Sequence, residues 1–599
     1  MQTTINGADI RAILNQARRL APQNKLTPSP EDWRDCWIYF LMVDRFNNPA
    51  GPPKSEFDVK FGGFQGGTIE GMRQQLDYLK DLGVGAVWFS PVLKNCQFLD
   101  GHPNDGTYHG YGIQNFLDID PRFASDHQNA VDELRRFVDD AHAKGIYVIF
   151  DIVLNHTGDV FAYGSGSEAP FSATPYDRVR WRDENGNARA DWTVGEAIAD
   201  PPVDATIYPD ELRRNDFFRR QGTPRPGGPE TVGDFSSLKQ LLTANHELGN
   251  VLIRCFQYLI AAFDIDGFRI DTLKYLDQDF ALRFGNAIRE FALSVGKKNF
   301  FTYGEVYDDE QKISQYIGRN VSASGEMVGV DASLDFPLFF RLPSALKGLL
   351  PPSEVVAMYQ VRKIVEKGII SSHGEATRFF VTFLDNHDQH SRFCYSDPAD
   401  PHRFDEQATM GFACLFALPG IPCLYYGTEQ GLHGNGDSDQ NVREALWGKP
   451  QAFDPGHPFF AVIQRISQVR SEQPALRYGR FYFRPISGNG VQFGVSTFAG
   501  GVLAFSRVLN DEEVLVVANT NTQAAFVGFV IVDSNLNPPG SQFDVLFTNR
   551  EIHAKPGPVR STGAVEIHEV DGTVSAGPAC VVPVNVGPMQ IQILGRPIP

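Results

Sequence analysis

The stretch Gly267-Phe268-Arg269-Ile270-Asp271-Thr272-Leu273-Lys274-Tyr275 follows an apolar helical run that ends near residue 263, so we expect it to enter the core as a short strand. Side chains two positions apart on a strand share a face, so Arg269 and Asp271 project together. A guanidinium beside a carboxylate favours the ionised acid, which is the form that a nucleophile requires. Taken alone, the nine residues favour a structural ion pair at a strand end.

The same arrangement recurs along the chain, where other apolar runs also end in polar residues. Near-continuous apolar runs are typical of parallel strands buried on both faces. Amphipathic stripes separate them, and the stripe that begins at Val131 stops at Gly145. The runs lie at residues 38–43, 86–89, 146–154, 267–271, 300–304, 329–338, 379–384 and 421–426. This order predicts an α/β fold, a (β/α)8 TIM barrel whose polar strand ends meet at one mouth.

The sequence pattern divides the chain into four regions. Residues 1–35 include an amphipathic segment at 7–20 and predict an N-terminal helical extension. Residues 36–156 and 239–475 form the predicted barrel. Residues 157–238, rich in Gly, Pro, Asp and Arg, are too long for a simple connection and predict an inserted subdomain after strand 3. Residues 476–599 change to short alternating segments with turn signals, which predict a C-terminal antiparallel β-sandwich.

Composition and charge exclude several classes of function. The 599 residues carry a formal net charge of -18, which argues against nucleic acid or an anionic membrane surface as a partner. No apolar run reaches the length of a membrane span, and the start Met1-Gln2-Thr3 is not that of a signal peptide, so a cytoplasmic location is the default expectation. The 7 scattered cysteines predict buried free thiols rather than disulfides or a zinc site. The sequence gives no indication of the oligomeric state.

Three carboxylates stand at predicted strand ends: Asp271, Glu305 and Asp388. Cleaving a glycosidic bond with retention requires a nucleophilic carboxylate and a protonated acid about 5 Å apart. Asp271 beside Arg269 suits the nucleophile, and Glu305, which follows a glycine in an apolar strand, suits an acid with a raised pKa. Their strands are neighbours in sequence order, so we expect the two acids to lie side by side in the barrel.

Four stretches resemble, in order and spacing, the signature motifs of the α-amylase family of retaining glycoside hydrolases (glycoside hydrolase family 13). They are Asp151-Ile152-Val153-Leu154-Asn155-His156, Gly267-Phe268-Arg269-Ile270-Asp271, Gly304-Glu305-Val306-Tyr307 and Phe383-Leu384-Asp385-Asn386-His387-Asp388. Flanking segments at 38–46, 108–111, 420–429 and 439–447 are also similar to the family, so the resemblance covers about residues 36–475. Each motif alone is weakly specific, whereas four in order on predicted strands leave little room for chance.

The resemblance implies a role for each catalytic carboxylate. Asp271 would be the nucleophile that forms a β-glycosyl intermediate, and Glu305 would be the general acid and base. Asp388 would stabilise the oxocarbenium-like transition state, and Arg269 would orient Asp271. No organic cofactor is expected for this chemistry.

The resemblance also implies a set of sugar-binding residues. His156 and His387 would hydrogen-bond the sugar in the cleaved subsite, and Tyr111 would stack on it. Asp439 and Arg443 match a pair that binds the non-reducing side of the cut, although a simple loop ion pair is the alternative for these two. Such residues predict an α-glucan or maltooligosaccharide as the partner.

A structural calcium ion is a further implication of the resemblance, and it stays open. Asn155 matches a family position that ligates calcium between the barrel and the inserted subdomain, and Asp234 lies where a second ligand is expected. Calcium takes six to eight oxygen ligands, and two candidates are too few to assert a site.

Lys274 is the sequence's clearest indication of linkage. Thr272-Leu273-Lys274 after the nucleophile looks like family members that cut α-1,4 bonds, where the lysine would reach a sugar on the leaving-group side. The leading hypothesis is therefore a retaining hydrolase of starch-like α-1,4-glucans or maltooligosaccharides. The alternative is a transglycosylase or a cyclomaltodextrin- or short-oligosaccharide-specific enzyme with the same site. A non-catalytic binding relative is disfavoured, because such relatives typically lose a catalytic acid and this chain keeps all three.

Overall fold

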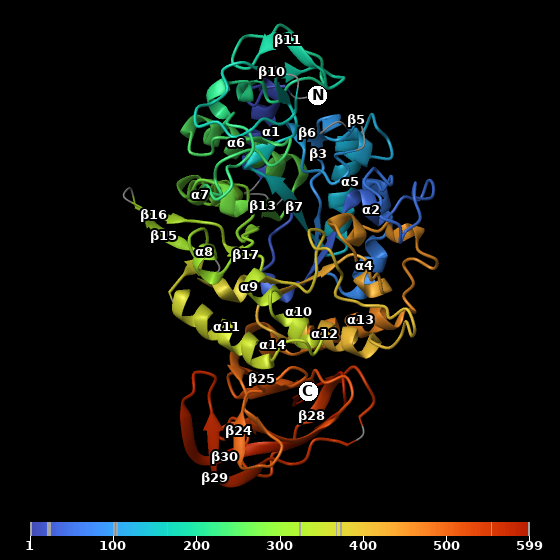
Figure 1. Ribbon diagram of the computed structural model, residues 1–599, viewed down its shortest axis with the longest axis vertical. Helices are drawn as coiled ribbons and strands as arrows, with labels where there is room; N and C mark the ends of the chain where they lie inside the picture. Colours follow the sequence, from blue (N-terminus) through green and yellow to red (C-terminus); the bar gives the residue numbers. More distant parts are fainter. Residues whose placement is uncertain are drawn as a thin grey trace.

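The computed structural model describes residues 3–20, 26–99, 102–103, 106–164, 166–322, 325–366, 368–371, 374–552 and 554–596. Figure 1 shows the residues inserted after the third barrel strand at the top, the barrel in the middle and the C-terminal strands at the bottom. Within the described ranges, no helix combines the length and the apolar character that crossing a membrane requires.

A barrel of parallel strands forms the centre of the molecule. In sheet order its strands are β17 (Ala332–Ser333), β14 (Phe301–Gly304), β13 (Gly267–Asp271), β7 (Tyr147–Val153), β2 (Ala86–Phe89), β1 (Ile38–Leu41), β21 (Ile421–Tyr425) and β20 (Val381–Thr382). A parallel bridge between Leu334 and Val381 joins the two ends of this sheet. The predicted (β/α)8 barrel is confirmed, with each strand in one of the apolar runs of the sequence.

Helices cover the outside of the barrel. The longer ones are α1 (Ala8–Leu20), α5 (Ala130–Ala143), α6 (His246–Phe263), α7 (Gln278–Ser294), α11 (Pro352–Val365), α12 (Asp405–Ala417) and α13 (Pro458–Glu472). The Asn245 side chain caps α6 by accepting from the backbone N–H groups of Glu247 and Leu248. The apolar stripe at 72–82 forms two helices, α3 (Ile69–Gln74) and α4 (Leu76–Leu82), and the second ends at the left-handed Gly83. Helix α1 packs against α6.

The insertion after the third barrel strand begins and ends on one small sheet. Strand β8 (His156–Thr157) pairs antiparallel with β12 (Lys239–Gln240), so the two ends of the insertion lie together. Between them, β9 (Phe161–Tyr163), β10 (Val179–Arg182) and β11 (Ala188–Thr193) form a second antiparallel sheet. This arrangement holds the insertion next to the carboxyl end of β7, where the barrel mouth opens.

Two sheets make up the C-terminal region. One contains β22 (Arg480–Phe483), β25 (Val502–Leu509), β26 (Glu512–Asn519), β31 (Gln590–Gly595) and β28 (Asp544–Thr548). The other closes on itself through β23 (Ile486–Ser487), β24 (Gln492–Gly494), β29 (Arg560–His568), β30 (Val574–Val586) and β27 (Phe526–Val532). The strands pair antiparallel as predicted, except that β24 and β29 run parallel.

Burial follows the expected division between core and surface. All seven cysteines are free and buried, which confirms the prediction of buried free thiols.

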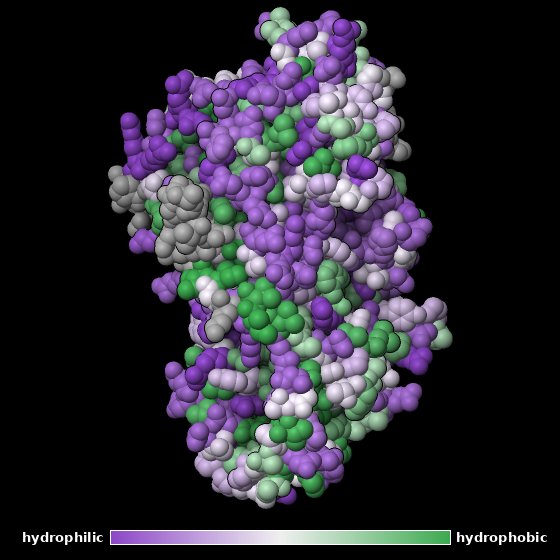
Figure 2. Space-filling view, turned by 60° about the vertical axis from the view of Figure 1, so that its left-hand side comes forward, coloured by the Kyte–Doolittle hydropathy of each residue, from purple (hydrophilic) through white to green (hydrophobic). Residues whose placement is uncertain are grey.

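Figure 2 shows a mostly hydrophilic face with a hydrophobic patch at mid-height. The domain boundaries proposed from the sequence remain predictions.

Candidate active site

Strand register brings the polar side chains of the barrel mouth to one level. Arg269 on β13 lies opposite Asp151 on β7 and opposite Tyr303 on β14. The backbone N–H of Glu305 donates to the carbonyl of Ile270, so Glu305 lies beside the end of β13. Because the strands are parallel and in register, these motifs reach the mouth together.

Arg269 is the centre of this cluster. One guanidinium nitrogen, Nη1, donates to Asp271 Oδ1 at 2.8 Å and to Asp151 Oδ1 at 2.9 Å. The other, Nη2, donates to Glu305 Oε2 at 2.8 Å. The arginine is 1% exposed, so its geometry is fixed by packing. A single planar guanidinium therefore holds two of the three predicted catalytic acids, Asp271 and Glu305, together with Asp151.

The turn after β13 provides a further hydrogen bond to Glu305. Thr272 adopts a left-handed conformation with φ 49°, which is strained for a β-branched residue, and its N–H donates to Glu305 Oε2 at 3.1 Å. The short 3-10 turn Leu273–Tyr275 then packs over β14, where a Cβ on Gly304 would lie 2.0 Å from Leu273. Gly304 is needed for this close approach.

Burial dominates the electrostatics of the cluster. It raises the pKa of Asp151 to about 6, against the opposing effect of Arg269. It also raises the pKa of Asp271 well above its usual value; Arg269 opposes this shift, while Glu305, Asp151 and Asp388 add to it. The expectation that Arg269 alone would keep Asp271 readily ionised is therefore only half right. Several carboxyls around one guanidinium favour retention of a proton in the cluster.

Asp388 lies across the mouth and is held by the residues after the eighth strand. Arg443 Nη2 contacts Asp388 Oδ1 at 3.1 Å and Asp439 Oδ2 at 2.6 Å, and its Nη1 donates to the hydroxyl of Tyr108 at 3.0 Å. The Asp388 side chain is 41% exposed, against 8% for Asp271. Asp388 thus faces the space that a ligand would enter, and Asp439 with Arg443 is joined to it as one network.

A hydrogen-bonded chain joins the two sides of the site. The Tyr111 hydroxyl donates to Asp151 Oδ2 at 2.9 Å and lies 2.7 Å from His387 Nε2. Burial, with Arg443 and Arg269 nearby, lowers the pKa of His387 well below its usual value. The imidazole is therefore neutral, and since Tyr111 has one proton, Nε2–H donates to the phenol oxygen. The 3.3 Å contact of Nε2 with Asp388 is accordingly not an ion pair.

His156 is buried, as are His387 and Arg269 of the predicted sugar-binding set. It is 3% exposed, its ring meets Phe235 edge-on at 5.6 Å, and neither ring nitrogen has a hydrogen-bond partner among the described residues. Burial lowers its pKa to about 4, so the ring is neutral. A buried imidazole with two unsatisfied nitrogens is suited to a ligand hydroxyl.

Lys274 is engaged within the protein. Its Nζ donates to the carbonyl of Tyr307 at 3.1 Å and to Glu230 Oε1 at 3.2 Å, and it lies 3.6 Å from Asp308. Burial opposes its charge, but Tyr275, Glu230 and Asp308 raise its pKa, so it remains an ammonium. The side chain is 9% exposed, so it can offer only part of its ammonium to a sugar.

The two candidate calcium ligands lie close together but do not fit a calcium ion. Asp234 already accepts from the Tyr163 hydroxyl at 2.7 Å and from the backbone of Gln240 at 2.8 Å. The Gln240 amide is also the partner of Asn155 Oδ1, at 3.5 Å. No group of three or more His, Cys, Asp or Glu side chains in the described ranges is arranged to hold a metal. Calcium needs many free oxygens, and these oxygens are committed to donors.

A protein cation lies beside this pair. Lys239 is fully buried, its Nζ is 3.1 Å from Asp159 Oδ1, and it also donates to the carbonyl of Ser167. Arg182 lies 3.1 Å from the other Asp159 oxygen. Lys239 lowers the pKa of Asp234, although burial still raises that pKa to about 6. Positive charge at this junction is therefore supplied by the chain itself.

A cavity of about 570 Å³ is lined by Arg443, which contacts Asp388, and by Asp439. Its walls come from the segment before β6 (Ile113–Ile119), from the end of the insertion and from the loop after β21. The lining residues include Phe61, Tyr108, His109, Phe235, Ser236, Asp439 and Arg443. This volume is within the range of small-molecule sites.

Four residues of the site had no assigned role in the sequence interpretation: Asp151, Tyr108, His109 and Glu230. Asp151 lies within a recognised motif, and its place two residues along a buried strand from the mouth was the available signal. Tyr108 and His109 precede Tyr111 in the same loop; burial lowers the pKa of His109 to about 3, and its Nδ1 accepts from the Tyr111 backbone at 3.0 Å. No local pattern in the sequence predicts Glu230 as the partner of Lys274.

Comparison with known proteins agrees with this geometry. The family model for the α-amylase catalytic domain matches residues 40–465. An α-amylase of Streptomyces lividans is 28% identical over 514 residues, which cover 78% of this chain and 52% of that protein. A cyclomaltodextrin glucanotransferase of Geobacillus stearothermophilus is 27% identical over 501 residues, which cover 82% of this chain and 60% of that protein. The chain thus spans about half to three-fifths of the length of these relatives.

Solved structures share the whole fold. The crystal structure of an Anoxybacillus α-amylase superposes with a TM-score of 0.63 at 24% identity, over 95% of this chain and 100% of that one. At this identity the likeness shows the fold alone. The match over residues 40–465, which contain the barrel and its acid cluster, carries the assignment, and the chain belongs to the α-amylase family of glycoside hydrolases.

Proposed function

We propose that this protein is a retaining hydrolase of α-1,4-glucans or maltooligosaccharides, acting through a β-glycosyl-enzyme intermediate. The observation that carries the proposal is the sharing of Arg269 by Asp271 and Glu305, from adjacent strands, at 2.8 Å each. This sharing keeps the carboxyls close together, as retention requires, whereas inversion needs room for a water between them.

In the first step, Asp271 attacks the anomeric carbon while Glu305 transfers its proton to the departing glycosidic oxygen. The glycosidic bond breaks as the bond to Asp271 Oδ forms, and Arg269 balances the charge that shifts between the two acids. In the second step, Glu305 accepts a proton from water, and the hydroxide oxygen displaces Asp271 from the same carbon. Two inversions give net retention.

Neutral donors and acceptors around the cluster would hold the sugar. His156 and His387 are both neutral; His156 can donate from one ring nitrogen and accept at the other, whereas His387 donates to Tyr111 from Nε2 and can accept only at Nδ1. Asp388, with Arg443 behind it, faces the same space and can stabilise positive charge at the anomeric centre. Substrate would fill the cavity lined by Tyr108 and Asp439 on the non-reducing side.

Two observations help to decide whether the glycosyl group is transferred to water, which is hydrolysis, or to another sugar, which is transglycosylation. The family includes both kinds of relative, since one match is named an α-amylase and another a cyclomaltodextrin glucanotransferase. Lys274 on the leaving-group side donates to Glu230 and Tyr307, so its ammonium group is less free to hold an acceptor sugar. We therefore favour water as the acceptor, with transglycosylation as the second candidate.

The product profile tests this proposal. Maltoheptaose, β-cyclodextrin and soluble starch are incubated separately with the enzyme and with an Asp271→Asn control, and the product sizes are read by chromatography. For maltoheptaose, hydrolysis predicts only products shorter than the substrate, and the control should give no products from any of the three substrates. Products longer than the substrate would favour the transferase, and activity retained by Asp271→Asn would refute the mechanism.

A further inference from the structure

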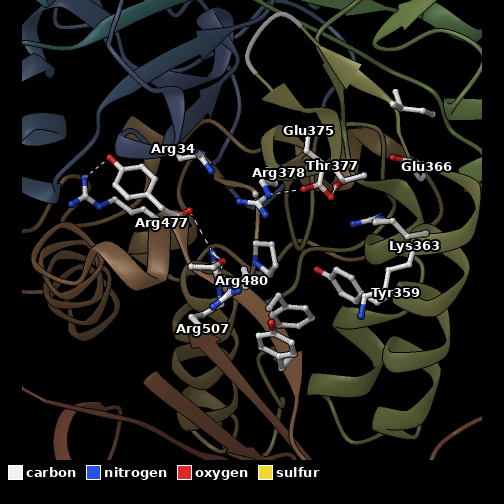
Figure 3. A pocket seen from close by; sticks show the side chains of 18 of the residues that line it. Arg34, Tyr359, Lys363, Glu366, Glu375, Thr377, Arg378, Arg477, Arg480 and Arg507 are labelled. Atoms are coloured by element: carbon white, nitrogen blue, oxygen red, sulfur yellow. Dashed lines mark hydrogen bonds and ion pairs between the residues drawn. The ribbon is translucent and has the colours of Figure 1, made fainter. Parts of the chain in front are cut away.

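A second cavity lies at the opposite end of the barrel from the carboxylates. Its volume is about 570 Å³. Arg34 precedes β1, Arg378 precedes β20 and Gly420 precedes β21, so the cavity adjoins the amino ends of these strands. The end of α11 and the first C-terminal strand, β22, form its other walls (Figure 3). Since the active site lies at the carboxyl ends, the two cavities are separate.

The lining of this cavity is strongly cationic in an acidic protein. Six arginines and Lys363 line it, against two carboxyl groups, Glu366 and Glu375. The whole chain has a net charge of -18, so a local excess of positive charge runs against its composition. In Figure 3 the side chains of Arg34, Arg378 and Arg480 are directed toward the same space.

The two carboxyls neutralise only one of these cations. Glu375 is paired with Arg378 at 2.7 Å. Burial and the neighbouring Glu310 raise the pKa of Glu366 to about 10, so this group is uncharged near neutral pH. Arg362 is taken by Glu310 and Asp335, outside the cavity.

Three lining cations are left without a carboxylate partner among the described residues. Arg34 pairs with Asp32, and Arg477 pairs with Asp35. Lys363 and Arg480 make no ion pair with a described residue. Arg507 is 2% exposed and donates only to backbone carbonyls, those of Ala417, Gly479 and Arg477.

Buried positive charge behind the cavity adds to the excess. Arg470 is 3% exposed and also donates only to carbonyls, among them those of Phe416 and Gly420. Burial, together with repulsion from neighbouring arginines, lowers the pKa of both Arg470 and Arg507 to about 9. A buried charge without a counter-charge is unfavourable, so an anion in the cavity would stabilise this end of the barrel.

The remaining walls are flat and apolar. Tyr359, Tyr478, Phe481 and Tyr482 line the cavity, and the Arg34 guanidinium lies 5.0 Å from the centre of the Tyr478 ring. Aromatic faces and stacked guanidinium planes favour a ring-shaped group. The volume is that of a small organic ligand rather than a single ion.

We propose that this cavity binds a small organic phosphate. Arg480 and Lys363 contact the phosphate, and the positive charge of the buried Arg507 attracts it electrostatically. The organic ring of the ligand packs against the aromatic wall. A phosphate group carries close to two negative charges at neutral pH, which matches three uncompensated cations better than a single carboxylate does. The guanidinium fork suits bidentate recognition of phosphate oxygens.

Calorimetric titration of the full chain tests the proposal. The probes are AMP, glucose 6-phosphate and inorganic phosphate, with adenosine and glucose as neutral counterparts. We expect at least one organic phosphate to bind more tightly than inorganic phosphate, and no heat from the neutral compounds. The double variant Arg480→Ser/Lys363→Ser should weaken binding by about tenfold or more, the effect of losing charge-assisted hydrogen bonds.

A matched variant controls for net charge. Arg136 and Lys298 are exposed and lie outside this cavity, so Arg136→Ser/Lys298→Ser removes the same charge elsewhere and should leave affinity unchanged. The proposal is overturned if no organic phosphate binds at millimolar concentration, if inorganic phosphate binds as tightly as the organic ones, or if the two double variants behave alike. Both variants should retain glucan hydrolysis, because neither touches the acid cluster.

Discussion

Arg269 contacts three carboxyl groups with one guanidinium, and this excess of acidic groups determines how readily the cluster gives up its protons. Asp151, Asp271 and Glu305 each accept from it, and the cluster is almost completely buried. In a low-dielectric site, one positive charge cannot compensate three negative ones, so the cluster as a whole favours retention of a proton. Asp151 also accepts from Trp88 and Tyr111, and we regard it as the residue that positions Arg269.

Replacing Asp151 with asparagine should show whether Asp151 positions Arg269 for catalysis or only stabilises the fold. The variant keeps the size of the side chain but places an amide among three donors, so kcat should fall by about 100-fold, a typical cost of misplaced catalytic groups. Because the Asp151 charge raises the pKa of Asp271, its removal should move the acid limb of the pH–rate profile to lower pH. Steady-state rates across pH measure both effects.

Asp118→Asn is the control, since this aspartate is partly buried outside the cluster. A drop in rate with an unshifted pH profile would mean that Asp151 acts only on folding.

At the residue scale, the sequence predicted which residues form the site better than it predicted their protonation states and hydrogen-bond partners. The strand ends and motifs name Asp271, Glu305, Asp388 and Arg269, because spacing along a strand fixes which side chains share a face. The pKa of Asp271 was not predictable, since it depends on burial and on charges from other strands. The internal partners of Lys274 were hidden for the same reason: Glu230 and Asp308 come from separate loops.

Between elements, a buried ionic cluster joins α5 to the segment between α6 and β13. His142 Nε2 is 2.7 Å from Asp266, and Lys297 contacts Asp266 at 2.7 Å and Asp264 at 2.6 Å. Burial opposes the charged ring, but Asp264 and Asp266 raise the pKa of His142 to about 9. A raised pKa means that its stabilising contribution is complete below the unfolded value, about 6.5, and is lost as pH rises through about 9.

The variant His142→Gln should therefore be less stable than the parent at pH 6, by about 3 kcal/mol, and nearly equal to it above pH 9. Thermal unfolding followed by circular dichroism over this pH range gives the comparison. A constant difference at every pH would show that His142 acts through packing and not through its charge.

The base of the insertion provides a second test between elements. Since Lys239 supplies the positive charge near Asp159 and Asp234, chelation by EDTA should leave the melting temperature unchanged. Lys239→Met should lower stability by about 1 to 3 kcal/mol, because one oxygen of the buried Asp159 carboxylate loses its partner while Arg182 keeps the other. Thermal unfolding of the parent with EDTA and with added calcium tests the first expectation, and unfolding of Lys239→Met tests the second. A melting temperature that falls with EDTA and recovers with calcium would contradict this interpretation.

The calcium expectation, which stays a prediction, involves contacts that motif matching does not reveal. Asn155 and Asp234 do come close, as their sequence positions suggested, but the hydrogen bonds of Gln240 to both fix their oxygens. A two-residue pairing across β8 and β12 creates those contacts, and no local pattern encodes it.

On the scale of the whole molecule, the C-terminal strands share a core with the barrel. Phe505, Val516 and Ile593 belong to the same buried cluster as the barrel strands, and α12 and α13 contact this sheet. Arg507 on β25 also donates to the carbonyl of Ala417 at the end of α12. The sandwich predicted from turn spacing is therefore joined to the barrel by packing that the sequence did not indicate.

Removing residues 476–599 should consequently destabilise the barrel and not leave an intact enzyme. The truncated chain would expose the apolar faces of α12 and α13, so it should aggregate or melt well below the full chain. Solubility and calorimetric unfolding measure this; a soluble, active fragment with an unchanged melting temperature would show that the two parts are independent.

The account as a whole depends on retention at the anomeric carbon through Asp271 and Glu305. Proton NMR during the first minutes of maltoheptaose hydrolysis identifies the anomer released before mutarotation, with Asp271→Asn as the inactive control. The account predicts that the α-anomer appears first and later equilibrates with the β-anomer. Initial release of the β-anomer would contradict it.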